Sequence, residues 1–144
     1  MNKPYLSKKS RKLVFERADF KCEYCFSLEQ YSSSPFDIEH IIPLSKGGNN
    51  DIKNLALACH GCNLHKYNKM FGIDSESSLL EPLYNPRKDS WKDNFEWNEG
   101  FTIILGLIPI GRATIETLQL NRFKLINQRM VFREVGLHPP AFTL

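Results

Sequence analysis

The sequence predicts an α+β fold, in which a small ββα core is followed by a C-terminal β-hairpin and one long helix. Three patterns predict it. Apolar and polar residues alternate over residues 36–41, as in a strand. Apolar residues recur at spacings of three, four or seven over 114–135, as in a helix. Two Cys-x-x-Cys pairs, Cys22–Cys25 and Cys59–Cys62, bracket the segment that contains the first strand.

The N-terminal elements follow in order. Residues 7–17 predict a helix with Leu13, Val14 and Arg17 on one side and Ser7 or Ser10 as its cap. Residues 20–25 predict a short knuckle that carries the first cysteine pair. A serine-rich loop over 28–35 leads into the strand at 36–41, in which Asp37, Glu39 and His40 are the polar positions.

A second strand and a helix complete the core. Residues 43–50 form a turn-rich loop with Gly47-Gly48, and residues 54–58 predict a short second strand. A helix is then expected from near Gly61 to about Met70, with Asn63, Lys66 and Tyr67 on its first turns. We therefore assign residues 1–73 to a core with a basic N-terminal arm.

Residues 74–144 are expected to form an extension packed on that core. Residues 75–78 predict a loop, and residues 91–97 and 101–107 predict the two strands of a hairpin. The helix over 114–135 has Thr114 as a plausible N-cap and Gly136 as a plausible stop.

Composition places the chain among globular proteins. It has 144 residues, 42% hydrophobic and 24% charged, with a formal net charge of +3. No signal peptide is visible, and the apolar stretch over 103–110 is broken by Gly106 and Pro109 and is too short to span a bilayer. The sequence therefore predicts a cytosolic protein without a membrane partner.

The first dozen residues are basic and contain no acid. They suit contact with phosphate, although a solvated N-terminus explains them equally well. The basic residues are Lys3, Lys8, Lys9, Arg11 and Lys12.

Four cysteines in two Cys-x-x-Cys pairs favour a metal ion over disulfides in a reducing compartment. Their spacing is typical of a Cys₄ site that binds Zn²⁺ tetrahedrally. His60 and His65 are possible substitute ligands, but four thiolates already close the site. A closed site has no open position for a substrate, so we expect this zinc to be structural.

The segment between the pairs, together with the residue after the second pair, carries groups suited to hydrolysing a phosphodiester. This reaction needs a base that activates water and a divalent cation that stabilises the developing charge. His40 offers an imidazole, Glu39 a hard oxygen ligand for Mg²⁺ or Mn²⁺, and Asn63 a neutral carbonyl oxygen. Because neighbouring strand residues point to opposite sides, Glu39 and His40 need a local distortion, or a cation at the strand edge, to share one site.

The combined pattern resembles the HNH endonuclease family, also called ββα-metal or His-Me finger nucleases. The resemblance covers about residues 13–70 and is carried by Cys22-x-x-Cys25, Ile38-Glu39-His40-Ile41-Ile42-Pro43-Leu44-Ser45-Lys46-Gly47-Gly48, Asn54-Leu55, and Cys59-His60-Gly61-Cys62-Asn63 with Lys66.

The resemblance implies a role for each matched position. His40 takes the place of the general base, Glu39 that of the acidic metal ligand, which is commonly Asp, and Asn63 that of the last metal ligand. Asn54 takes the place of the Asn that braces the loop between the strands, so that this is an H-N-N variant. Tyr67 stands where some members add a His, which implies more water ligands on the cation and suits Mg²⁺.

The resemblance implies a metal-dependent endonuclease acting on DNA, most simply double-stranded, with Lys66, Lys46 and Arg87 beside the phosphates. A non-catalytic zinc module that binds nucleic acid or protein is the alternative. The tail resembles one that follows such cores in bacterial, notably cyanobacterial, proteins. Its aromatic residues predict a small core or, less favoured, a platform for stacking bases, and its arginines could contact phosphates. These residues are Trp91, Phe95, Trp97, Arg112, Arg122, Arg129 and Arg133.

Overall fold

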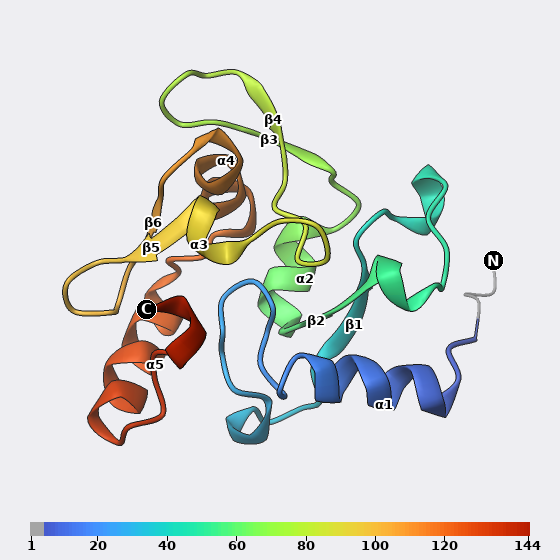
Figure 1. The fold of residues 1–144 in the computed structure, drawn as a ribbon, viewed down its shortest axis with the longest axis horizontal. Coiled ribbons are helices and arrows are strands. Elements are labelled where there is room, and N and C mark those ends of the chain that lie inside the picture. Colours follow the sequence, from blue (N-terminus) through green and yellow to red (C-terminus); the bar gives the residue numbers. More distant parts are fainter. Residues whose placement is uncertain (1–4) are drawn as a thin grey trace. The chain divides into compact units, whose positions relative to one another are not determined.

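The computed structural model describes residues 5–144, so Lys3 of the basic arm lies outside the described residues. The chain divides into two compact units, the first ending at Asn68 and the second spanning Lys69–Leu144 (Figure 1). Each unit combines short two-stranded sheets or a hairpin with helices, which confirms the α+β class. None of the helices within residues 5–144 is long and apolar enough to cross a bilayer.

The first unit contains the predicted strand–loop–strand–helix order. Its elements are α1 (Lys8–Arg17), β1 (Asp37–His40), β2 (Leu55–Ala58) and α2 (His60–Lys66). Strands β1 and β2 are antiparallel, and their pairing runs without interruption from Asp37 opposite Ala58 to His40 opposite Leu55. Helix α1 contacts β2, and α2 contacts both strands (Figure 1).

Side-chain hydrogen bonds hold both ends of helix α1. The Ser7 side chain accepts a hydrogen bond from the Ser10 backbone N–H, which caps the first turn. At the other end the Arg17 guanidinium donates to the carbonyls of Ile52 and Leu55, at 2.9 and 2.7 Å. These bonds tie α1 to the beginning of β2, whose four residues are all buried.

Helix α2 is shorter than predicted. It ends at Lys66 because Tyr67 has a positive φ of 51°, while its backbone N–H still bonds to the Asn63 carbonyl. The extension of this helix to Met70 was therefore wrong, since the last residues before β3 leave the helical path.

The loop between β1 and β2 depends on its two glycines. Gly47 has a φ of 89°, in the region that favours glycine. Gly48 lies so close to the backbone that an added Cβ would come within 1.8 Å of the Ile42 carbonyl oxygen. The Gly47-Gly48 pair therefore lets the loop fold back on the chain directly after His40.

The second unit has more elements than predicted. They are β3 (Phe71–Ile73), β4 (Leu80–Pro82), α3 (Trp91–Asn94), β5 (Phe95–Trp97), β6 (Ile104–Gly106), α4 (Pro109–Leu118) and α5 (Phe123–Glu134). The β3–β4 and β5–β6 pairs are antiparallel hairpins. The predicted strand over 91–97 is half correct, because its first residues form the helical turn α3.

The single helix predicted over 114–135 is two helices. Gln119 adopts a left-handed conformation with a φ of 53°, which ends α4, and the Arg122 side chain bonds to the Leu118 carbonyl at the break. Thr114 lies inside α4 and is not its cap, because its hydroxyl donates to the Ile110 carbonyl one turn earlier. Gly136 follows α5 with a φ of 78°, as expected for a helix stop.

The aromatic residues of the tail form a core. Trp91, Phe95 and Trp97 are buried, and the ring centroids of Trp91 lie 5.5 Å from those of both others. The platform for stacking bases is therefore wrong, since these rings offer no open face. Two of the tail arginines are structural as well: Arg129 is buried under Trp97 and donates to backbone carbonyls, and Arg112 forms a bidentate pair with Asp74.

Candidate metal centre and active site

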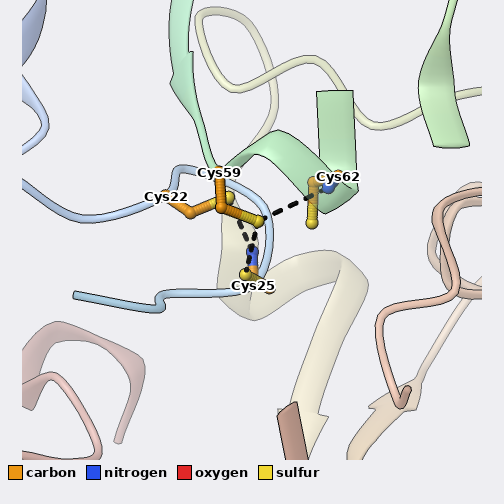
Figure 2. A group of neighbouring side chains, drawn as sticks. All are labelled: Cys22, Cys25, Cys59 and Cys62. Carbon is orange, nitrogen blue, oxygen red and sulfur yellow. Dashed lines mark hydrogen bonds between the residues drawn. The ribbon is translucent and has the colours of Figure 1, made fainter. Parts of the chain in front are cut away.

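The four cysteines converge on one point. Cys22 and Cys25 lie on the loop after α1, whereas Cys59 and Cys62 lie at the junction of β2 and α2 (Figure 2). All four side chains are buried, and their sulfur atoms lie within 4.8 Å of one another. The predicted clamp between two distant knuckles is therefore present.

Each knuckle is shaped by its own backbone. The N–H of Cys25 points to Cys22 Sγ at 3.5 Å, and the N–H of Cys62 points to Cys59 Sγ at 3.4 Å (Figure 2). Burial raises the pKa of the Cys22 thiol, whereas hydrogen bonds from the other three cysteines lower the pKa of Cys59. Cation binding by such a cluster displaces its remaining thiol protons.

The sulfur positions fit a tetrahedral ion. A Zn–S bond of about 2.3 Å gives a tetrahedron with edges of about 3.8 Å, and Cys25 Sγ lies 3.7 Å from Cys59 Sγ. This distance is far longer than a disulfide bond of about 2.05 Å, and no disulfide joins these residues. Four thiolates would hold zinc in a closed site whose contribution is to join the two knuckles.

His40 lies at the end of β1 and is held by the following loop. Its Nε2 lies 2.7 Å from Asn50 Oδ1. Because an amide oxygen only accepts hydrogen bonds, Nε2 carries the proton, and Nδ1 of the neutral ring is left with a lone pair. Within residues 5–144, no partner bonds to this Nδ1.

Asn54, directly before β2, holds the same loop. Its Oδ1 accepts from the Ile42 N–H at 2.8 Å, and its Nδ2 donates to the carbonyls of Ile42 and Asn49 at 3.0 and 2.9 Å. Asn54 thus fixes both ends of the loop that carries Asn50, and through it the ring of His40.

Glu39 is one residue away but in different surroundings. Its side chain is 2% exposed, and its carboxylate lies 3.0 Å from the Lys66 ammonium and accepts a hydrogen bond from the Tyr24 hydroxyl. Burial raises the pKa of Glu39, while Lys66 and then Tyr24 oppose that shift. The uninterrupted β1–β2 pairing leaves no bulge, so Glu39 and His40 keep opposite sides of the strand.

Lys66 was expected to contact phosphate, and the structure corrects this. Its side chain is 2% exposed, and besides Glu39 its Nζ donates to the carbonyls of His40 and Ile41, at 3.2 and 3.1 Å. A buried ammonium with three partners cannot reach a nucleic acid. It fixes the backbone of His40.

These contacts also bear on the predicted cation ligands. Both Glu39 oxygens already have partners inside the core, so Glu39 and Asn63 as placed do not fit a shared Mg²⁺ or Mn²⁺ ion. The Asn63 amide instead donates to Asp37 Oδ2 at 3.1 Å. His60 Nδ1 lies 3.0 Å from the same oxygen.

A pocket of about 340 Å³ opens beside His40. Its walls are formed by Ile38, Glu39, His40, Pro43, Leu44, Ser45, Asn63, Tyr67 and Asn68. The structure therefore brings His40 and Asn63 to one pocket, next to the exposed Lys46 on the adjoining turn.

The remaining basic residues of the prediction belong to other elements of the chain. Lys8, Lys9 and Arg11 are exposed on α1, in the first unit. Arg87 belongs to the second unit, where its backbone N–H bonds to Asn85 Oδ1 in a turn.

Sequence reasoning missed Asn50, Tyr24 and Asp37. Asn50 lies ten positions after His40, beyond a short 3-10 turn (Leu44–Lys46), so no periodicity marks their contact. Tyr24 lies between two cysteines of the predicted zinc site, and the composition of that segment does not indicate a role for this tyrosine. Asp37 was detectable, because strand alternation puts it on the same side as Glu39, toward α2.

Comparison with known proteins agrees with this geometry. The family model of the HNH endonuclease matches residues 22–69, which include both cysteine pairs, His40, Asn54 and Asn63. Anaredoxin from Nostoc sp. is 31% identical over 67 residues, which cover 46% of this chain and 82% of that protein. The chain therefore belongs to the HNH endonuclease family, with a cluster of four cysteines that suits a zinc-stabilised member.

Proposed function

We propose that this protein is a metal-dependent endonuclease that hydrolyses phosphodiester bonds in DNA, with His40 as the general base. One observation carries the proposal. His40 lies in an open pocket with its Nε2 bound to Asn50, so that the lone pair of Nδ1 is available to a water molecule.

The reaction needs one proton transfer at this atom. As the water oxygen attacks phosphorus, Nδ1 of His40 accepts the water proton, and the bond from phosphorus to the leaving oxygen breaks. Asn50 holds the ring in the tautomer that can accept this proton. Asn54 and Lys66 keep the backbone on both sides of the ring in place.

A divalent cation, Mg²⁺ or Mn²⁺, would stabilise charge on the phosphate and on the leaving oxygen. The pairing of Glu39 with Lys66 argues against Glu39 as its ligand, and Asn63 is the pocket residue best placed to contribute one.

Double-stranded DNA is the proposed substrate. Lys46 is exposed next to the pocket and is the proposed contact to a flanking phosphate. The exposed Lys8, Lys9 and Arg11 on α1 would add attraction that depends on salt but not on base sequence.

The experiment compares supercoiled plasmid nicking by the wild-type protein and the His40→Ala variant, each with its zinc content measured. We expect nicking to fall by at least 100-fold at unchanged zinc content. Equal nicking by the two proteins would refute the assignment of the base. Salt-sensitive DNA binding without any cleavage would support the non-catalytic module instead.

A second candidate comes from the relative in Nostoc, whose name, anaredoxin, has the form of a redox protein name. Four tetrahedral thiolates bind iron as well as zinc, and the sulfur cluster fits either ion. In that case the purified protein would contain iron and show visible absorption that disappears on reduction. Colourless protein with one equivalent of zinc excludes this candidate.

A further inference from the structure

Tyr67 has a backbone conformation that residues with side chains rarely adopt. It follows the last residue of α2 with a φ of 51° and a ψ of −122°, a combination that suits glycine. The preceding Lys66 is tied to Glu39 and to two backbone carbonyls at the end of β1, so the end of the helix is fixed where Tyr67 begins. Strain that the surrounding structure holds in place is typical of functional sites.

The ring of Tyr67 contributes little to the fold. The residue is 73% exposed, although a tyrosine ring offers a large apolar surface for burial. It nevertheless lies beside the proposed general base, because Tyr67 and His40 line the same pocket. An exposed aromatic ring, held by a strained backbone at the wall of this pocket, is placed to contact a substrate rather than to support the core.

The pocket has a polar and an apolar part. Its polar lining includes His40 and Asn63, where a phosphate would lie. Its apolar lining consists of the Tyr67 ring together with Ile38, Pro43 and Leu44. A volume of about 340 Å³ is near the lower end of the range for ligand pockets, so there is room for one nucleotide but not for a stacked base pair. A nucleotide with its phosphate at His40 can therefore place its base against Tyr67.

Only an unpaired base can offer its face to this ring. In a continuous duplex each base is stacked between its neighbours, and a protein reaches the base edges, the sugars and the phosphates. An unpaired base leaves the stack at lower cost and can stack on an aromatic side chain whatever its identity. The exposed Lys46 beside the pocket suits the phosphate of the next nucleotide.

We propose that Tyr67 is a specificity-determining residue, whose ring stacks on an unpaired base next to the phosphate at His40. The protein then prefers a duplex that contains an unpaired nucleotide over a continuous one. This preference rests on the proposed function in that the pocket binds DNA, and it adds the kind of DNA that binds best.

The test measures DNA affinity by fluorescence anisotropy on the zinc-loaded full-length protein, without added divalent cation. The probes are a labelled duplex and the same duplex with one unpaired nucleotide at its centre. We expect the wild-type protein to bind the second duplex more tightly by about fivefold or more, and Tyr67→Gly to lose this preference. Tyr67→Phe keeps the ring and should retain the preference.

Two controls separate stacking from folding. Phe20 is an aromatic residue of the first unit that is also exposed, at 46%, and also has a positive φ, of 54°, but it does not line the pocket. Phe20→Gly should therefore retain the preference. Tyr67→Gly should not lower the urea midpoint of the first unit, because glycine adopts this φ without strain and little buried surface is lost.

Each outcome decides a part of the proposal. Equal affinity of the wild-type protein for the two duplexes, or an unchanged preference in Tyr67→Gly, overturns it. A urea midpoint that falls by more than about 0.5 M in Tyr67→Gly also overturns it, since the ring then serves the fold. A preference that needs Tyr67, in a wild-type protein that never nicks plasmid, leaves the stacking contact standing and removes the proposed function.

Discussion

Replacing Lys66 with Met tests whether a buried ion pair supports the backbone of His40. Methionine is of similar length, so the change removes the charge and three polar contacts without leaving a large cavity. Both Lys66 and Glu39 are 2% exposed in their side chains. Removing one partner of such a pair leaves an uncompensated buried charge and typically costs about 3–5 kcal/mol.

The expected loss is therefore about 3 kcal/mol or more in the free energy of unfolding of the first unit. With a urea slope of about 1–2 kcal/mol/M, this moves the midpoint by about 1.5–3 M. Both tryptophans, Trp91 and Trp97, lie in the second unit, so tryptophan fluorescence does not report on this change. The assay follows the reaction of the four cysteine thiols with a coloured reagent at increasing urea concentrations.

The matched control is Lys12→Met. Lys12 and Glu16 also form a Lys–Glu pair, but at 3.8 Å and with side chains 75% and 57% exposed, so the loss should be below about 0.5 kcal/mol. Adding Glu39→Gln to Lys66→Met should recover part of the loss, because the buried negative charge then disappears. A Lys66→Met effect as small as that of Lys12→Met would show that the buried pair does not support the fold of the first unit.

The loss of stability in Lys66→Met should depend on pH in a defined direction. Burial raises the pKa of Glu39, and removing Lys66 removes the strongest influence that opposes this. A carboxyl whose pKa is raised on folding favours the folded state at low pH and loses that contribution as the pH rises. The Lys66→Met penalty should therefore be larger at pH 8 than at pH 6, and an equal penalty at both would contradict the assignment.

Three further predictions follow. Asn50→Ala should lower plasmid nicking about tenfold or more while leaving zinc content unchanged, because the ring of His40 loses its orienting partner; nicking at the wild-type rate would contradict this. Hydrogen bonds from Arg112 hold the pKa of Asp74 below its ordinary range, so their pair stabilises the second unit above about pH 4 and this contribution is lost as the pH falls further. Asp74→Asn should therefore weaken the loss of stability in acid, measured by tryptophan fluorescence in denaturant. An unchanged pH dependence of the stability would contradict this role of the pair. Removing zinc with a chelator should expose the cysteines and abolish nicking, whereas the fluorescence of the core around Trp91 and Trp97 should persist, as expected for two compact units; loss of both together would contradict separate units.

The elements that the sequence predicted best have local causes. The cap at Ser7, the alternation around β1 and the stop at Gly136 each depend on residues within one or two turns of the chain. The cysteine spacing was equally informative, because a tetrahedral thiolate site leaves few arrangements for two knuckles.

The errors arose where tertiary contacts, rather than local sequence, determine the structure. Helical spacing continues through Gln119, but a left-handed residue and the Arg122 side chain break the helix there. Trp91 fits a strand pattern, yet packing against Trp97 places it on a helical turn. A lysine after the last cysteine looks available to phosphate until the fold buries it against Glu39.

The candidate site, too, could be predicted only in part. The resemblance to the HNH family singled out His40, Asn54 and Asn63, but it did not distinguish which carboxylate on β1 faces Asn63. Both Asp37 and Glu39 point toward α2, and the choice depends on Lys66, which occupies the place beside Glu39.

We propose that a zinc ion stabilises the fold of the first unit and that a second, weakly bound cation takes part in the hydrolysis. The most direct measurement combines metal analysis by mass spectrometry with plasmid nicking by the same dialysed sample, before and after adding Mg²⁺ or Mn²⁺. We expect one equivalent of zinc that survives dialysis, no nicking in that state, and nicking that rises and saturates with the added cation. Full nicking by the dialysed zinc protein, or none at any cation concentration, would contradict it.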